Sequence, residues 1–216
     1  MATHPKGLDP RATRPGDRLG EIVEASTTRL RAVAPRTFEA PAFGSFVKTS
    51  DTHRTTFGVV SHVEHASIDP SRRAIPLGRS WDELEREQPQ VRELLTTEFE
   101  AICVAFAEEN APVCAYLPPL PPRVHDFVEA CSPAEIVELT EDLGFIRTLG
   151  ACGLPVVGEL IAAAIRAAAS HRDDQRAFVV RAGREVADLF RMDHEQAMAI
   201  IRRIRIPEAR HTRTKR

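Results

Sequence analysis

Leu19-Gly20-Glu21-Ile22-Val23, within the stretch Arg18–Glu24, begins a series of short apolar segments separated by turn-forming residues. Similar segments follow at Arg29–Val33, Ser45–Lys48 and Phe57–Val63. Apolar β-formers that alternate or cluster at this short spacing are typical of strands joined by tight turns. The series predicts a small antiparallel barrel or sheet in the N-terminal half of the chain.

A further strand is expected from Phe99 onward. Residues 101 to 106 alternate between small and large side chains, and all of them are apolar. A strand that is apolar on both faces is central in a sheet or belongs to a barrel. After a turn at Glu108–Ala111 the chain is expected to return along Pro112–Leu117, so the predicted barrel spans residues 18–117.

The run Pro118-Pro119-Leu120-Pro121-Pro122 predicts a stiff connector with polyproline character. Such a run is also the kind of ligand that SH3 domains bind. We interpret it as an interdomain linker and as the boundary of the barrel.

The chain after this run has a helical pattern at residues 123–206. Signals for helix starts recur along it, as capping residues or as the first positions of periodic apolar stretches. They lie at Ser132 with Glu135, Leu154-Pro155, Gln175, and Asp193 with Gln196. The predicted fold class is therefore α+β, a small N-terminal antiparallel β-barrel followed by an all-helical C-terminal domain.

The segments outside these two units are polar. Residues 1–17 are rich in Pro, Arg, Thr and Gly, which predicts a disordered arm. Residues 65–79 have the composition of a long loop, and Ser80 with Glu83 forms a capping box at the start of a short helix. Residues 207–216 form a basic tail.

The composition excludes several classes of protein. The 216 residues contain 29 basic and 31 acidic side chains, so no overall charge favours nucleic acid or an anionic membrane. The four cysteines form no C-x-x-C pair and no leader precedes them, so we expect reduced, mostly buried thiols. The longest apolar stretch, residues 151–169, contains Glu159 and Arg166, which predicts a helix of a cytoplasmic protein without a membrane span.

No sequence motif points to catalysis or to a cofactor. The chain has no P-loop, no Gly-x-Ser-x-Gly, no His-Glu-x-x-His and no Gly-x-Gly-x-x-Gly. His62 and His65 would point to opposite faces of a strand, so we do not predict a metal site there. The pairs Glu98 with Glu100 and Asp51 with His53 are interpreted as solvated polar groups. We predict no catalytic residue, cofactor or metal, and a hydrolase with an interdomain site remains the weaker alternative.

The C-terminal region concentrates positive charge. Seven basic residues are the candidate contacts for nucleic-acid phosphates: Arg202, Arg203, Arg205, Arg210, Arg213, Lys215 and Arg216. No aromatic residue is interleaved with them for base stacking. We favour a solubilising terminus, and a nucleic-acid-binding module that uses barrel loops and this tail is the main alternative.

The β-region resembles the HAS-barrel family, the N-terminal barrel of HerA-type ATPases and of rotary ATP-synthase subunits. The resembling residues are Leu19-Gly20-Glu21-Ile22-Val23, Ala25-Ser26-Thr27-Thr28, Gly44-Ser45-Phe46-Val47-Lys48 and Phe57-Gly58-Val59-Val60. In that family the barrel precedes an ATPase core, whereas here helices follow it. No nucleotide-site residue has a matching position in this chain.

The resemblance implies a barrel that serves as an assembly or docking surface, since such barrels form a collar on a ring and contact partner subunits. A closed barrel offers its outer face and loops to a partner. Arg29, Arg31 and Lys48 are the candidate partner surface. The predicted function is a non-enzymatic assembly or docking subunit with a protein partner such as a HerA-like DNA-processing ATPase, and a homo-oligomer remains open.

Overall fold

The computed structural model describes residues 18–69, 71 and 74–204. The predicted arm at residues 1–17, the tail at 207–216 and part of the loop at 65–79 lie outside them. Six strands form a closed barrel in the order β1-β2-β5-β4-β3-β6, with every neighbouring pair antiparallel. The strands are β1 Arg18–Ala25, β2 Arg29–Val33, β3 Phe46–Ser50, β4 Arg54–Ser67, β5 Leu95–Glu108 and β6 Phe127–Ala130.

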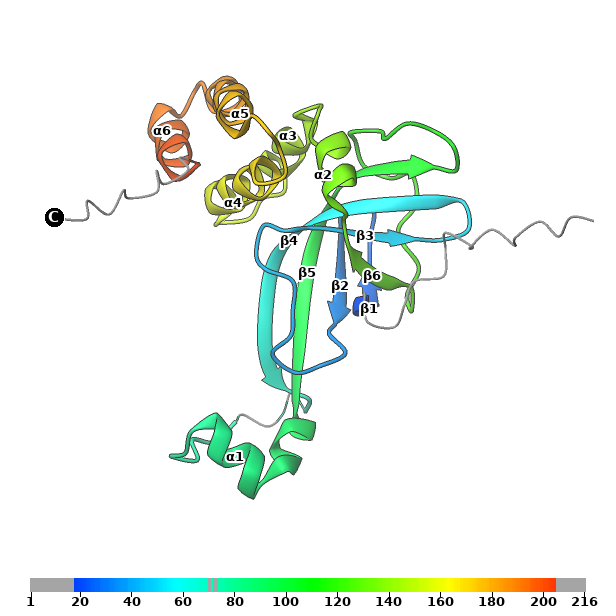
Figure 1. Ribbon diagram of the computed structural model, residues 1–216, viewed down its shortest axis with the longest axis vertical. Coiled ribbons are helices and arrows are strands. Elements are labelled where there is room, and N and C mark those ends of the chain that lie inside the picture. The colour runs from blue at the N-terminus through cyan, green and yellow to red at the C-terminus, as the bar shows by residue number, and fades with distance from the viewer. Residues whose placement is uncertain (1–17, 70, 72–73, 205–216) are drawn as a thin grey trace, which may run out of the picture.

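Helices follow the barrel, so the predicted α+β class is confirmed (Figure 1). They are α2 Pro133–Leu139, α3 Gly144–Gly150, α4 Val157–Ala169, α5 Gln175–Leu189 and α6 His194–Arg203. The capping box of Ser132 with Glu135 is present, and Asp193 caps α6 through the amide of Gln196. These caps satisfy backbone donors that a helix start otherwise leaves unpaired.

Two parts of the prediction differ from the structure. The returning strand at Pro112–Leu117 is absent, apart from one isolated bridge between Phe106 and Cys114. The sixth strand is β6, which lies within the region predicted to be wholly helical and pairs with both β1 and β3. The barrel therefore extends past the expected boundary at residue 117, because β6 is needed to close it. β6 has four residues, too few for a clear alternation of apolar and polar side chains to show in the sequence.

The proline run crosses the barrel unit before β6. Pro118 and Pro122 are buried, while Leu120 is exposed. The guanidinium of Arg54 donates a hydrogen bond from Nη1 to the carbonyl oxygen of Leu120 at 3.4 Å. The run is thus packed against the barrel by its own prolines, and the SH3-ligand alternative would require those buried rings to be accessible.

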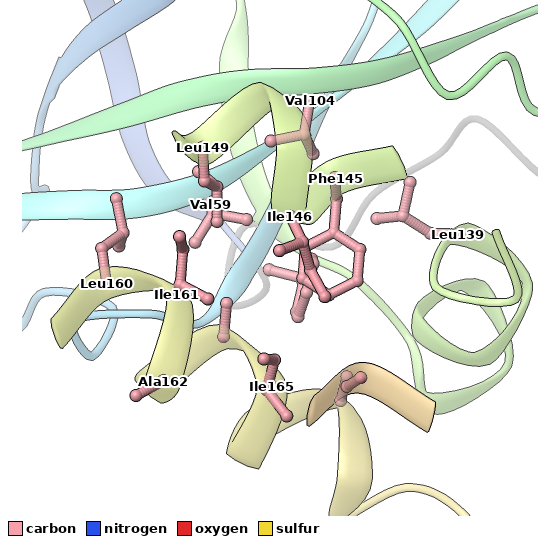
Figure 2. Close-up of a cluster of buried hydrophobic side chains, with 14 of the residues drawn as sticks. Val59, Val104, Leu139, Phe145, Ile146, Leu149, Leu160, Ile161, Ala162 and Ile165 are labelled. Carbon is pink, nitrogen blue, oxygen red and sulfur yellow. The ribbon is translucent and has the colours of Figure 1, made fainter. Parts of the chain in front are cut away.

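The barrel and the helices share a buried core. Inside the barrel, Ile22, Leu30, Val47 and Phe99 belong to one apolar cluster. A second cluster joins the outer face of β4 and β5 to α2–α6. Figure 2 shows Val59 and Val104 among side chains of α3 and α4. This shared cluster packs the helices directly against the outer face of the barrel.

Gly44, just before β3, fits the close approach of the barrel to α4. Its φ is +82°, and a Cβ added there would lie 2.4 Å from the Cβ of Ala163. Glycine adopts a positive φ without steric penalty and has no side chain to clash with the helix. Gly44 therefore permits the close approach of the backbone before β3 to α4.

The β4–β5 hairpin continues beyond the barrel as an arm, seen at the bottom of Figure 1. The last pair of β5 with β2 is at Glu98. Beyond it, in the arm, residues 65–67 of β4 pair with residues 95–97 of β5, and the tip carries α1 Trp81–Glu87 and the 3-10 helix η2 Pro89–Leu94. The predicted capping box of Ser80 and Glu83 starts α1. No residue of α1 or η2 is buried.

Candidate partner-binding groove

A groove of about 760 Å³ lies between the barrel and the helices. One wall comes from the β1–β2 turn and β5, which contribute Arg29 and Ile102. Tyr116 and Leu117 border it before the proline run, and residues 147–154, at the end of α3 and after it, form the opposite wall. We call this feature the barrel–α3 groove.

The lining of the groove includes an accessible apolar surface. Ile102 is buried at its base, and Leu117 and Leu154 retain partial exposure. Tyr116, the single tyrosine of the chain, is 62% exposed. Its ring packs edge-on against Phe106, with centroids 5.4 Å apart at an interplanar angle of 81°. Such edge-to-face pairs favour one ring orientation, so Tyr116 is held at the border of the groove.

Two of the charged side chains that line the groove are neutralised within the chain. Glu100 accepts bonds from Arg31, at 2.6 Å from Nη2 and 3.1 Å from Nε. Arg147 pairs with Glu185 at 2.6 Å. The hydrogen bond from Arg31 to Glu100, followed by their charge attraction, raises the pKa of Arg31 above its usual value. These ion pairs leave little net charge to attract a ligand.

Arg29 differs from these residues. It is exposed, and it makes no ion pair with any other residue in the ranges 18–69, 71 and 74–204. The turn before it is held by Ser26, whose Oγ accepts bonds from the amides of Thr28 and Arg29 at 3.3 and 3.1 Å. This turn sets the first residue of β2 opposite Ile102. Beside its apolar base the groove therefore has one cation without an ion pair, Arg29, and one such carboxylate, Glu24, whose charge acts on Arg31.

The three residues predicted as a partner surface thus have different surroundings. Arg29 borders the groove, whereas Arg31 is paired with Glu100 and Lys48 is paired with Glu135. The Nζ of Lys48 lies 2.6 Å from Oε1 of Glu135, and both side chains are half-buried. Strand alternation indicated that these residues point outward, but it could not indicate which element covers the outward face.

The lysine contact changes the titration of its partner. Burial raises the pKa of Glu135, and hydrogen bonds from Lys48 and from Ser132 lower it by more. The net pKa lies below the ordinary value, so the carboxylate stays ionised and joins β3 to the start of α2. Lys48 is a structural contact between barrel and helices.

The basic C-terminal residues are only partly described. Arg202 is exposed. Arg203 pairs through Nε with Glu159 at 2.6 Å, and its carbonyl oxygen accepts a bond from Arg166 at 2.6 Å. The other candidate nucleic-acid contacts, Arg205, Arg210, Arg213, Lys215 and Arg216, lie outside the described residues.

The two histidines considered for a metal site are both on β4. The Nε2 atom of His62 is 3.7 Å from Oε2 of Glu64, and Nδ1 of His65 is 2.9 Å from Oγ1 of Thr97. His65 had been expected in a loop, and its pairing with Thr97 in the ladder explains the longer strand. In the part of the chain that the structure describes, no group of three or more His, Cys, Asp or Glu side chains is arranged to hold a metal ion.

The acidic residues considered for hydrolysis have local partners. Asp51 accepts hydrogen bonds from the amides of His53 and Arg54 at 2.7 and 2.8 Å, which closes the β3–β4 turn. Glu100 is bound to Arg31, and the charge of Glu98 also acts on that guanidinium. These carboxylates stabilise strands and turns of the barrel.

All four cysteines are free thiols, and Cys103 and Cys131 are buried. Burial raises the pKa of Cys103 to about 12, and burial also raises the pKa of Cys131. A thiol needs its thiolate form to react, so these two behave as small apolar core residues, as predicted. Cys114 and Cys152 are half-buried, and Cys152 lines the groove.

Comparison with known proteins gives no family assignment. No protein-family model matches the chain, and no curated protein matches it significantly. Across residues 18–69, 71 and 74–204, the helices are all too short or too polar to span a bilayer.

Sequence reasoning missed the groove, although it selected Arg29. Tyr116 and Leu117 were expected in a strand, where their side chains would have faced opposite sides. A sequence signal was nevertheless present, because the only tyrosine lies next to a proline run that cannot pair as a central strand. The opposite wall could not be found from the sequence, since it depends on where α3 packs.

Proposed function

We propose that this protein is a non-enzymatic assembly or docking subunit of the cytoplasm, and that the barrel–α3 groove receives an apolar segment of a protein partner. The observation that carries the proposal is the unpaired guanidinium of Arg29 beside the apolar base at Ile102. Protein interfaces are enriched in arginine and aromatic residues that surround desolvated apolar contacts. Arg29 and Tyr116 provide that combination at the border of one groove.

The form of the groove supports a peptide-like occupant. It is partly open to solvent and lined by barrel, loop and helix, so an extended segment or a short protruding element can enter. An occupant would cover Leu117 and Leu154 and bring a carboxylate to Arg29. Covering apolar area contributes about 25 cal/mol per Å², and an ion pair at the border adds orientation more than affinity.

The resemblance to the HAS-barrel family supplies the class of partner. In that family the barrels contact partner subunits of ring-shaped ATPases, so we propose a role beside a HerA-like DNA-processing ATPase. The role requires no nucleotide site in this chain.

Site-specific photo-crosslinking in cells tests the proposal. The photoreactive amino acid p-benzoylphenylalanine replaces Tyr116 in one variant and Val180, which is half exposed on α5, in a control. We expect a discrete protein adduct from position 116, and loss of this adduct when Arg29→Glu is added. No adduct at position 116, or the same adducts from both positions, would contradict a docking groove.

A further inference from the structure

The last part of β4 has a free edge. β3 pairs with β4 only as far as Val59, and the final backbone bonds on that side join Val60 to Gly44 and Ser45 at 2.8 and 3.0 Å. Residues 61–67 pair with β5 on their other side, and with no further strand in the part of the chain that the structure describes. In Figure 1 this part of β4 is the outermost strand, at the left of the picture. We call residues 61–67 the open edge.

The hydrogen bonds of β5 show which backbone groups of the open edge point outward. The carbonyl oxygen of Thr97 accepts a bond from the amide of Ala34, so the backbone of Thr97 faces away from β4. His65 lies opposite Thr97. Bonded and non-bonded positions alternate along an antiparallel pair, so His65, and Val63 and Ser67 on either side of it, direct their N–H and C=O groups away from β5. These groups have no hydrogen-bond partner among the described residues.

The open edge is held in the extended form that a further strand requires. Its pairing with β5 is continuous along residues 62–67. The ring of His65 packs edge-on against Phe38, with centroids 4.9 Å apart, and its Nδ1 lies 2.9 Å from Oγ1 of Thr97. A row of free N–H and C=O groups is a template for another strand, and proteins commonly block such rows with proline or lysine. The open edge contains neither residue.

Two carboxylates beside the open edge lack a strong cationic partner. Glu64 lies directly opposite Glu98 of β5, and like charges in this position destabilise a strand pair. Among the described residues, the ion-pair contact of Glu64 is with Nε2 of His62 at 3.7 Å, which is charged only when protonated. The charge of Glu98 acts on Arg31, but that guanidinium is hydrogen-bonded to Glu100. A cation added beside Glu64 would therefore relieve repulsion between two carboxylates.

We infer that the open edge binds an extended segment of a protein partner, which adds to β4 as an antiparallel strand and carries lysine or arginine beside Glu64. Antiparallel pairing is the arrangement of all the other strand pairs in the barrel. Glu64 lies between the outward-bonding positions Val63 and His65, and at such positions the Cα atoms of opposing residues are only about 4.5 Å apart. The open edge does not line the barrel–α3 groove, so this binding role is independent of the proposed docking role.

Charge and register disfavour a second copy of this chain as the added strand. Two open edges that pair symmetrically about His65 place Glu64 opposite Ala66, so each copy brings further carboxylates and no cation to Glu64. A register centred on Val63 would extend the pairing to Val59, whose edge β3 already occupies. A basic strand from another protein satisfies both the backbone groups and the charge.

A labelled peptide, acetyl-Val-Lys-Val-Lys-Val-Lys-Val-amide, tests strand addition to the full-length protein by fluorescence anisotropy. When the lysines lie beside Glu64, the valine amides face β4 and the lysine amides face solvent. We expect N-methylation of the valine amides to weaken binding by about tenfold or more, because it removes the donors of the ladder. N-methylation of the lysine amides is the matched control and should leave binding nearly unchanged.

Charge variants test the chemistry of the partner. Glu64→Lys should weaken binding of the peptide by about tenfold, since it replaces attraction with repulsion at an exposed position. Glu138→Lys, at an exposed position of α2, makes the same change in net charge and should leave binding unchanged. A peptide with glutamate in place of lysine should bind more weakly than the lysine peptide. Thermal unfolding checks that both variants are folded.

Amide hydrogen exchange measured by NMR locates the bound strand. We expect the peptide to slow exchange at Val63, His65 and Ser67, whose amides are free without it. Absence of binding, equal losses from the two methylated peptides, or protection elsewhere would overturn the inference. Protection of the same three amides that rises with protein concentration, without peptide, would show that a second copy is the occupant and would overturn the assignment of a basic partner.

Discussion

The two halves of the β4–β5 hairpin have the same backbone pairing but different surroundings. In the half within the barrel, Val59 and Val104 are fully buried under α3 and α4 (Figure 2). In the other half, which forms the arm, Ile68 and Leu94 are mostly exposed. No helix after β6 reaches the arm in Figure 1.

This difference shows that apolar residues on one hairpin can have two roles. Where a second layer covers the strands, they contribute to the core, and their removal should destabilise the fold. Where no layer covers them, they are exposed in the monomer and contribute little to its stability. These exposed side chains are available for contact with a partner. Variants matched between the two halves should therefore separate stability from association.

Removing the covering layer should have the largest effect. A chain of residues 17–131 keeps all six strands but lacks α2–α6, so the outer faces of β4 and β5 lose their cover. We expect loss of cooperative unfolding and binding of a hydrophobic dye. A chain of residues 17–120 also lacks β6 and should be unfolded by circular dichroism.

The matched deletion removes the tip of the arm. Replacing residues 69–93 with a short Gly-Asn turn should leave cooperative thermal unfolding intact, because no residue of α1 or η2 is buried and the deletion removes little from the rest of the chain beyond the edge-on contact of Trp81 with Phe38. If the shortened-arm chain unfolds and the 17–131 chain does not, the roles assigned to the two halves are reversed.

Two isoleucines compare the halves at single-residue scale. Ile161→Ala on α4 should lower the free energy of unfolding by about 3–4 kcal/mol, because it leaves a cavity in a close-packed core. Ile68→Ala on the arm should change it by less than about 0.5 kcal/mol. Urea denaturation measures both, and equal losses would contradict the distinction between core and contact residues.

Two glycines with positive φ form a similar pair. Gly44→Ala should lower the free energy of unfolding by about 2–3 kcal/mol, since its Cβ would clash with Ala163 in addition to the strained φ. Gly78→Ala, with φ +65° and no atom within 4 Å of the new Cβ, should lower it by about 1 kcal/mol. Thermal unfolding of both variants checks whether helix packing accounts for the difference.

The ion pair of Lys48 and Glu135 has a smaller and pH-dependent effect. Lys48→Met should lower the free energy of unfolding by about 1 kcal/mol near neutral pH. The pKa of Glu135 is lower in the folded chain than its ordinary value of 4.5, so the folded state is stabilised when the carboxylate is ionised. That stabilisation is complete above the ordinary pKa and is lost as the pH falls through the folded pKa.

Denaturation curves between neutral and acidic pH measure this dependence. The difference between the parent chain and Lys48→Met should shrink in acid. A difference that stays constant down to low pH would mean that Lys48 acts by packing alone. Charge removal at Arg92, in an exposed pair on the arm, is the control and should have almost no effect.

The C-terminal tail should have the smallest effect. Deleting residues 208–216 removes four basic residues, Arg210, Arg213, Lys215 and Arg216. We expect weak duplex-DNA binding at physiological salt with or without the tail. If the tail contacts phosphates, its deletion should reduce the slope of log affinity against log salt concentration by about three or four. That result would favour the nucleic-acid alternative.

Local elements were predicted well where short-range chemistry determines them. The range predicted for β2, Arg29–Val33, agrees with the structure, and the capping boxes at Ser80 and Ser132 are present. The missed elements are β6, with four residues, and α3, which has no side-chain cap. Elements this short contain too few residues for a period to emerge, and their existence depends on the barrel edge and the core that they complete.

The sequence by itself determined the β-rich and helical regions, the absence of known catalytic motifs, and the outward direction of Arg29, Arg31 and Lys48. These properties follow from strand and helix periodicity and from capping chemistry within a few residues. Only the tertiary structure decided that Arg31 and Lys48 are paired while Arg29 is not, that the proline run is packed against the barrel, and that the hairpin extends past its covering layer. Each of these depends on contacts between residues far apart in the chain, such as Lys48 with Glu135. The residues next to Lys48 in the sequence do not determine which distant side chain will contact it.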